Sequence, residues 1–215
     1  MVRVQPSPVQ SRILGAAVEL FAEQGFDATS VQAIVDRAEV TKGALYHYFT
    51  SKDDLLYEIY HGLIGRQLAD LDRIIAAGYP PFDTVRAIVV NLVETTTDAL
   101  AEAAIFAREM HKLGADRMEA VRSDRRRYDE AFRLVVARGQ RAGAFAPVAS
   151  PETVALIVFG IVHQLPQWYR PNGPKTPRQL GDEIADFVLA GLSPSAAPSA
   201  TPSAAASAAA SAHHS

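Results

Sequence analysis

Apolar residues recur at helical spacing along almost the whole chain. In the first such stretch they fall at positions i, i+3, i+4, i+7 and i+8, namely Ile13, Ala16, Ala17, Leu20 and Phe21. This spacing places them on one face of an α-helix. Ser7, Pro8 and Gln10 precede the stretch as typical helix-start residues, and Gly25 follows it as a typical helix end. No alternating run of strand length bounded by turn residues occurs, so the pattern predicts an all-α protein.

Two short helices and one long helix are predicted next. Ser30 is a typical N-cap for a helix over 31–38, and Thr41 is a typical N-cap for a helix that ends near Tyr48. Thr50 begins a capping-box pattern with Asp in the usual Glu position, which predicts the start of a long fourth helix. An amphipathic helix followed by two short helices with a tight turn between them forms the helix-turn-helix pattern. In that arrangement the third helix enters the major groove of DNA.

Five further helices bring the expected total to about nine. Their expected ranges are 82–101, 103–113, 117–142, 151–169 and 176–192, with Gly or Pro between them. The segment 155–165 is apolar on all sides, which indicates burial against a second subunit. From Ser193 onward, a Pro/Ala/Ser tract has too few large apolar side chains to pack, so we expect disorder there.

Composition and charge narrow the protein class. Hydrophobic residues make up 48% and charged residues 21%, as in soluble globular proteins, and no window approaches the roughly 18 apolar residues of a membrane span. The absence of Cys excludes disulfides and thiolate chemistry. The first ten residues lack the apolar core of a signal peptide, so we expect a cytoplasmic protein. Because the net charge is −3, any DNA contact must be local, and the window from Val40 to Lys52 contains two lysines and no acid.

The two faces of the predicted third helix carry different residue types. Its inward face contains Ala44, Leu45 and Tyr48, and its outward face contains Lys42, Gly43, Tyr46 and His47. Phe49 is expected to fill the junction with the fourth helix. This division leaves polar and aromatic side chains free to contact DNA.

The stretch from Ile13 to Leu56 resembles the DNA-binding domain of the TetR family of bacterial transcriptional regulators. The resemblance is carried by FAEQGF, TSVQAI and TKGALYHYF-x-SK-x-x-L, with matching spacing across three helices. It implies DNA contacts by Ser30, Gln32, Thr41, Lys42, Gly43, Tyr46, His47 and Lys52. Two alternatives stay open, since Tyr46 could pack in the core and His47 could be a solvated residue without a role. Many family members have Gly in the turn where this chain has Glu39, which would place a side chain in a left-handed conformation and a negative charge near DNA.

The rest of the chain resembles the ligand-binding and dimerisation domain of the same family. We therefore expect a DNA-binding domain over 1–50, a ligand-binding and dimerisation domain over 51–192 and a disordered tail over 193–215. The segment WYRPNG resembles the W-Y-R-P-x-G segment of members that sense acyl-CoA thioesters. This resemblance implies that Trp168 and Arg170 lie at the mouth of the pocket. The alternative is that Trp168 merely closes a helix end and that Arg170 is solvated.

Further pocket candidates lie on apolar helix faces, where residues more often form ordinary core than ligand contacts. They are Phe106, Met110, Tyr128, Phe132 and His163. The stretch 122–141 carries seven arginines interleaved with acids, which favours an ion-paired solvated face, although two or three of them could bind the phosphates of coenzyme A. We expect no metal and no cofactor, because Glu109 and His111 are two residues apart on a helix and point in different directions.

These features predict a dimeric, ligand-responsive regulator of transcription. It would repress from a palindromic DNA operator and be released by a small molecule, an acyl-CoA thioester being the implied effector. The alternative is a helical sensor module with weak or no DNA binding, for which Glu39 and the acidic first segment argue. An enzyme is not expected, because the chain has no Cys, no nucleophile elbow and no Gly-rich phosphate loop.

Overall fold

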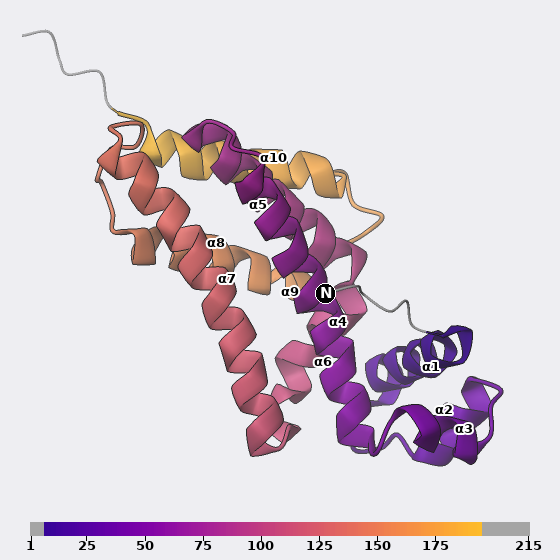
Figure 1. The fold of residues 1–215 in the computed structure, drawn as a ribbon. Helices are drawn as coiled ribbons and strands as arrows, with labels where there is room; N and C mark the ends of the chain where they lie inside the picture. The colour runs from indigo at the N-terminus through magenta and orange to yellow at the C-terminus, as the bar shows by residue number, and fades with distance from the viewer. Residues whose placement is uncertain (1–6, 195–215) are drawn as a thin grey trace, which may run out of the picture.

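The computed structural model describes residues 7–194, and within that range the chain forms helices and no strands (Figure 1). The α-helices are α1 (Pro8–Gln24), α2 (Val31–Arg37), α3 (Lys42–Tyr48), α4 (Lys52–Ala76), α5 (Pro81–Asp98), α6 (Leu100–Glu109), α7 (Ala115–Arg141), α8 (Pro151–His163), α9 (Leu165–Trp168) and α10 (Pro177–Leu192), and a 3-10 turn, η1, spans Met110–Lys112. The all-α prediction is confirmed. The tail expected to be disordered lies outside the described residues beyond Pro194. None of the helices in the described range is long and apolar enough to cross a membrane.

The first three helices form a small unit at one end of the molecule (Figure 1). The hydroxyls of Ser7, Ser30 and Thr41 each accept the backbone N–H three residues ahead, so all three predicted helix starts are confirmed. The apolar faces of these helices meet around the fully buried side chains of Phe21 and Leu45. Packing of this unit therefore fixes the direction in which the outer face of α3 points.

The start of α4 differs from the prediction by one residue. Ser51, not Thr50, is the N-cap, and its hydroxyl accepts the backbone N–H of Asp54 at 3.1 Å. The Asp54 carboxylate in turn accepts the backbone N–H of Thr50 at 2.8 Å. The capping interactions thus use Ser51 and Asp54, because this register turns the apolar residues Leu55 and Leu56 into the core, where both are buried.

The remaining helices build a bundle around α4, α5 and α7, with α10 packed along α5 (Figure 1). Gly181 permits this close packing, since a Cβ there would lie 3.0 Å from the Cα of Val90. The helix expected over 151–169 is broken into α8 and α9 around Gln164. Pro166 has no N–H to bond the carbonyl of Val162, which explains the break. The helix expected over 103–113 instead begins at Leu100 as α6 and is followed by the 3-10 turn η1. Helix α6 also contacts α1.

Candidate functional site

The outer face of α3 is exposed, as the sequence predicted. Lys42, Gly43 and His47 are exposed, and Tyr46 leaves 54% of its surface to solvent, so Tyr46 does not pack in the core. The aromatic residue Phe49 behind them is buried at the junction with α4. The helix therefore presents two ring side chains and one cation on a single outward surface.

The other residues implied to contact DNA already make bonds within the protein. The hydroxyls of Ser30 and Thr41 serve as N-caps of α2 and α3. Gln32 is exposed on α2 and donates from Nε2 to Oδ1 of Asp36 at 2.7 Å. A DNA contact by any of these three residues stays a prediction, and it fits most directly for the exposed Gln32.

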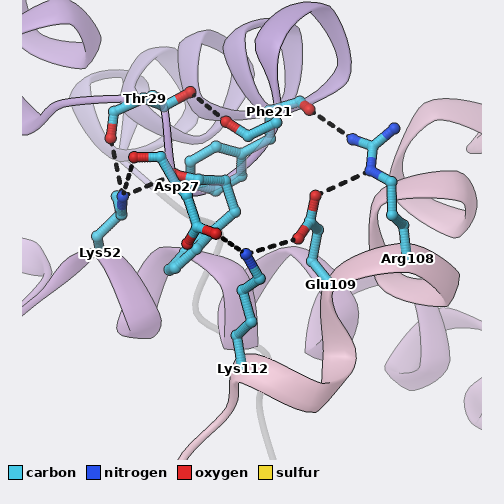
Figure 2. Close-up of polar contacts among 9 residues, drawn as sticks. Phe21, Asp27, Thr29, Lys52, Arg108, Glu109 and Lys112 are labelled. Atoms are coloured by element: carbon cyan, nitrogen blue, oxygen red, sulfur yellow. Dashed lines mark hydrogen bonds and ion pairs between the residues drawn. The ribbon is translucent and has the colours of Figure 1, made fainter.

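Lys52 has a place that the sequence did not indicate. Its ammonium donates to the backbone carbonyls of Phe26 at 2.6 Å and Thr29 at 2.9 Å, and it lies 4.3 Å from the centre of the Phe26 ring (Figure 2). These contacts tie the turn between α1 and α2 to the start of α4. Lys52 thus has a structural role, and its predicted phosphate contact would need these bonds to be released.

A second set of polar contacts joins the same turn to the end of α6 (Figure 2). Glu109 is only 5% exposed and accepts from Nε of Arg108 at 2.8 Å, while Nζ of Lys112 lies 3.4 Å from its other oxygen. Lys112 is also ion-paired with Asp27, and Nη2 of Arg108 donates to the carbonyl of Phe21 at 2.7 Å. Side chains from residues 108–112 therefore hold the DNA-binding unit against the larger bundle.

Two opposing effects act on the Glu109 carboxyl group. Burial by itself would raise its pKa, but hydrogen bonds from Arg108, from the backbone N–H of Phe26 and from Lys112 outweigh burial and lower the pKa below its usual value. Glu109 is therefore charged at neutral pH, and the folded state favours that charge.

The turn of the helix-turn-helix contains the Glu39 departure from the family pattern. Glu39 has a φ of 50°, which makes it the one non-glycine residue with a positive φ among residues 7–194. Arg12 stabilises the turn by donating from Nε to the carbonyl of Ala38 at 3.0 Å and from Nη2 to the carbonyl of Glu39 at 2.6 Å. Both bonds go to backbone oxygens, so they do not depend on the Glu39 side chain.

Glu39→Gly is expected to raise the free energy of unfolding by about 1 kcal/mol, because glycine adopts the left-handed conformation without steric cost. Urea unfolding would measure the change. Glu39→Gln is the control, since it removes the charge and keeps the strained conformation, and it should leave stability near that of the wild type. Equal stabilisation by both variants would show that charge, and not backbone strain, is responsible.

A cavity of about 790 Å³ opens among α4, α5, α7 and α8. Of the predicted pocket residues, Met110, Tyr128 and His163 border it. A smaller chamber of about 110 Å³ adjoins it and is bordered by Phe106, which stacks on Tyr60 with ring centres 3.8 Å apart. Two chambers that share part of their walls can hold one elongated ligand.

The other three predicted pocket residues do not border either cavity. Phe132 is fully buried and packs against Phe159, with ring centres 5.4 Å apart. Trp168 is 47% exposed at the end of α9, and Nη1 of Arg170 donates to the carbonyl of Tyr169 at 3.0 Å. Within the single chain, this geometry matches the helix-end alternative, and ligand contacts by Trp168 and Arg170 stay predictions.

The polar lining of the cavity was only partly foreseen. Gln67 and Thr96 border both chambers, and Nε2 of Gln67 donates to the Thr96 hydroxyl at 3.2 Å. In the sequence, Gln67 and Thr96 are each a polar residue on an otherwise apolar helix face, and this pattern could have identified them as cavity residues. His163 as a whole residue is exposed, but its ring borders the cavity, where partial desolvation and then the nearby Arg125 guanidinium lower its pKa to about 4. Its imidazole is therefore neutral at pH 7. No three His, Asp or Glu side chains between residues 7 and 194 lie close enough together to hold a metal ion.

Two family models together match most of the chain. Residues 13–59 match the model described as bacterial regulatory proteins, tetR family, and residues 78–192 match the tetracyclin repressor-like, C-terminal domain. Among curated proteins, the chain is 26% identical over 185 residues to the HTH-type transcriptional repressor KstR2 of Mycobacterium tuberculosis, covering 86% of this chain and 92% of that protein. The KstR2 of Rhodococcus jostii is 28% identical and is covered to 91%.

Solved structures show the same architecture. The ketosteroid transcriptional regulator KstR2 of Mycobacterium tuberculosis superimposes with a TM-score of 0.80 at 26% identity, over 90% of this chain and all of that chain. AibR, solved in complex with isovaleryl coenzyme A and operator DNA, has a TM-score of 0.71 at 23% identity over 82% of this chain and 96% of its own, a likeness of fold alone. With both family models matched in order and an exposed α3 following the α2 turn, the chain belongs to the TetR family of bacterial transcriptional regulators.

Proposed function

We propose that the protein is a transcriptional repressor that binds a palindromic DNA operator as a dimer and leaves it when an effector fills the cavity. The observation that carries this proposal is the presence, in one chain, of an exposed polar face on α3 and a large cavity in the bundle behind it. The related KstR2 proteins are described as transcriptional repressors. We assign DNA binding to residues 1–50 and effector binding and dimerisation to residues 51–192, with no catalytic role, and place the protein in the cytoplasm with its DNA.

Exposed apolar side chains support a dimer. Leu156 on α8 and Phe187 on α10 each leave 73% of their surface exposed, and Ile157 is also exposed. Large exposed apolar side chains are stabilised when a second copy covers them. A two-fold dimer would then present two copies of α3 to successive half-sites of the operator.

The effector proposed here is an acyl-CoA thioester. The cavity has a largely apolar wall, with Arg122, Arg126 and Arg133 at its border, so an acyl chain and a phosphate-bearing group would each find suitable partners. The related fold of AibR holds isovaleryl coenzyme A together with operator DNA in its crystal structure. The WYRPNG segment adds a resemblance to acyl-CoA-sensing members.

The decisive experiment is selection of DNA fragments by the purified protein, followed by a binding titration on the enriched sequence with and without a panel of acyl-CoA thioesters. A palindromic sequence that is released by at least one thioester supports the proposal. Failure to enrich any sequence would favour the alternative, a sensor module without DNA binding. Enrichment without release by any thioester would keep the regulator and reject this effector class.

Lys42→Ala is expected to weaken binding to the enriched operator about tenfold and to make the salt dependence of binding shallower by about one unit for each phosphate that the lysine neutralises. Lys42 is exposed at the first position of α3, so its removal should leave folding intact. Lys175→Ala is the matched control, because Lys175 is ion-paired with Glu183 of α10, a helix that packs on α5. Unchanged affinity in Lys42→Ala would contradict the docking of α3 in the groove.

A further inference from the structure

Polar side chains gather where the two chambers of the effector cavity meet. Arg125 and His163 border both the larger cavity and the smaller chamber, as do Gln67 and Thr96. The other residues that border both chambers are apolar, namely Ile64, Met110 and Val162. A ligand that spans both chambers must therefore pass a polar junction.

Arg125 differs from the other arginines at the cavity. Arg126 is ion-paired with Glu119 at 2.8 Å and Arg133 with Asp129 at 2.7 Å, whereas Arg125 has no carboxylate within 4.0 Å in the part of the chain that the structure describes. It is half-buried, and its guanidinium carbon lies 5.9 Å from the centre of the Phe106 ring, on the side of the smaller chamber. Among the described residues this cation therefore has no direct ion-pair partner.

His163 does not supply the missing charge. Nη2 of Arg125 lies 3.2 Å from Nε2 and 3.3 Å from Nδ1 of the imidazole, which partial desolvation at the cavity keeps neutral at pH 7. A neutral imidazole can accept one hydrogen bond from the guanidinium, and the other N–H groups of the guanidinium then remain available. Arg125 is thus oriented by His163 and free to bind an anion.

The smaller chamber holds another group without a partner. The hydroxyl of Tyr60 is buried and makes no hydrogen bond within residues 7–194, although the ring is held by stacking on Phe106. Burial raises the pKa of this hydroxyl, so it remains a donor. Buried polar groups are nearly always hydrogen-bonded, so an unpartnered hydroxyl on a residue that borders this chamber is an unusual feature.

We propose that the junction binds the carboxylate of an amphiphilic effector through Arg125, with the apolar body of that effector in the larger cavity. This inference rests on the proposed function, because it assigns chemistry to the same cavity. The guanidinium offers the two parallel N–H groups that match a carboxylate. The carboxylate belongs either to a free acid or to the far end of an acyl chain whose other end is a coenzyme A thioester.

Two pairs of probes distinguish these sources by calorimetric titration. The first pair is octanoate and octanamide, and the second is the coenzyme A monothioester of octanedioic acid and octanoyl-CoA. In one pair, the carboxylate-bearing member is expected to bind at least tenfold more tightly, as a charge-assisted bidentate contact predicts. The pair that shows the difference identifies the source. Equal affinity within both pairs, or no binding of any of the four probes, overturns the proposal.

Arg125→Met tests the residue itself. It is expected to abolish the tenfold preference for the carboxylate-bearing probe, whereas Arg127→Met should preserve the preference. Arg127 lies two residues away on α7, pairs with Asp72 and does not border the cavity, which makes it a matched control. A preference that survives in Arg125→Met rules out Arg125 as the carboxylate partner.

Thermal unfolding without ligand gives a second readout. Since Arg125 makes no ion pair within the described residues, Arg125→Met is expected to unfold at the wild-type temperature or above it. A lower unfolding temperature would mean that Arg125 stabilises the fold, and would overturn the proposal. Failure of the proposed function has a different signature, because a protein that enriches no operator DNA can still prefer octanoate to octanamide.

Discussion

Lys52→Met is expected to destabilise the protein by about 2 kcal/mol, more than a surface lysine would, because hydrogen bonds to a charged group typically contribute about 1.5–3 kcal/mol. The substitution keeps an unbranched apolar stem and removes the ammonium. It leaves the carbonyls of Phe26 and Thr29 without their donor and removes the cation above the Phe26 ring. The turn between α1 and α2 would then lose its attachment to α4.

Urea unfolding followed by circular dichroism would measure this destabilisation. Lys42→Met is the matched control, because Lys42 is an exposed lysine in the same unit and should change stability by less than about 0.5 kcal/mol. The two substitutions should therefore have different effects: the change at Lys42 should lower DNA affinity, and the change at Lys52 should lower stability. Wild-type stability in Lys52→Met together with weaker operator binding would instead restore the phosphate contact implied by the family resemblance.

The contrast between these two lysines illustrates how far the sequence could lead. The helix starts at Ser30 and Thr41 follow from local chemistry, in which a hydroxyl caps an N–H three residues ahead, and they were predicted correctly. The partners of Lys52 lie 23 and 26 residues earlier in the chain and are backbone oxygens, which carry no side-chain signature. Sequence patterns identify faces and ends of helices, while such tertiary partners depend on packing.

The same reason limits the prediction of the cavity. Met110, Tyr128 and His163 were candidates because they lie on apolar faces, yet so does Phe132, which packs in the core. Whether an apolar residue borders a void or a neighbour depends on the angle between helices, which periodicity does not encode. Sequence alone also allows two interpretations of Trp168, since a helix end and a pocket mouth favour the same residue types.

Glu109 offers a test of how the cavity and the DNA-binding unit are connected. Phe106 and Met110 border the chambers, while Arg108 and Glu109, between them in sequence, contact the turn and the end of α1 (Figure 2). A ligand that shifts this short segment must also disturb the contacts on its other side. By linkage, a change that weakens these contacts should reduce the effect of the effector on DNA affinity.

Glu109→Gln is expected to lower the free energy of unfolding at pH 7 by about 2 kcal/mol, because it removes the buried charge that Arg108 and Lys112 surround.

The size of this destabilisation should depend on pH with a defined sign. Since the folded state lowers the pKa of Glu109, its contribution is complete above the unfolded pKa, near 4.5, and is lost as the pH falls through the lower folded value. Urea unfolding of wild type and variant at pH 7, 5 and 3 should therefore show a stability difference that narrows as the pH falls. Glu102→Gln on the same helix is the control, and a Glu109→Gln difference that persists unchanged at pH 3 would contradict a role for the charge.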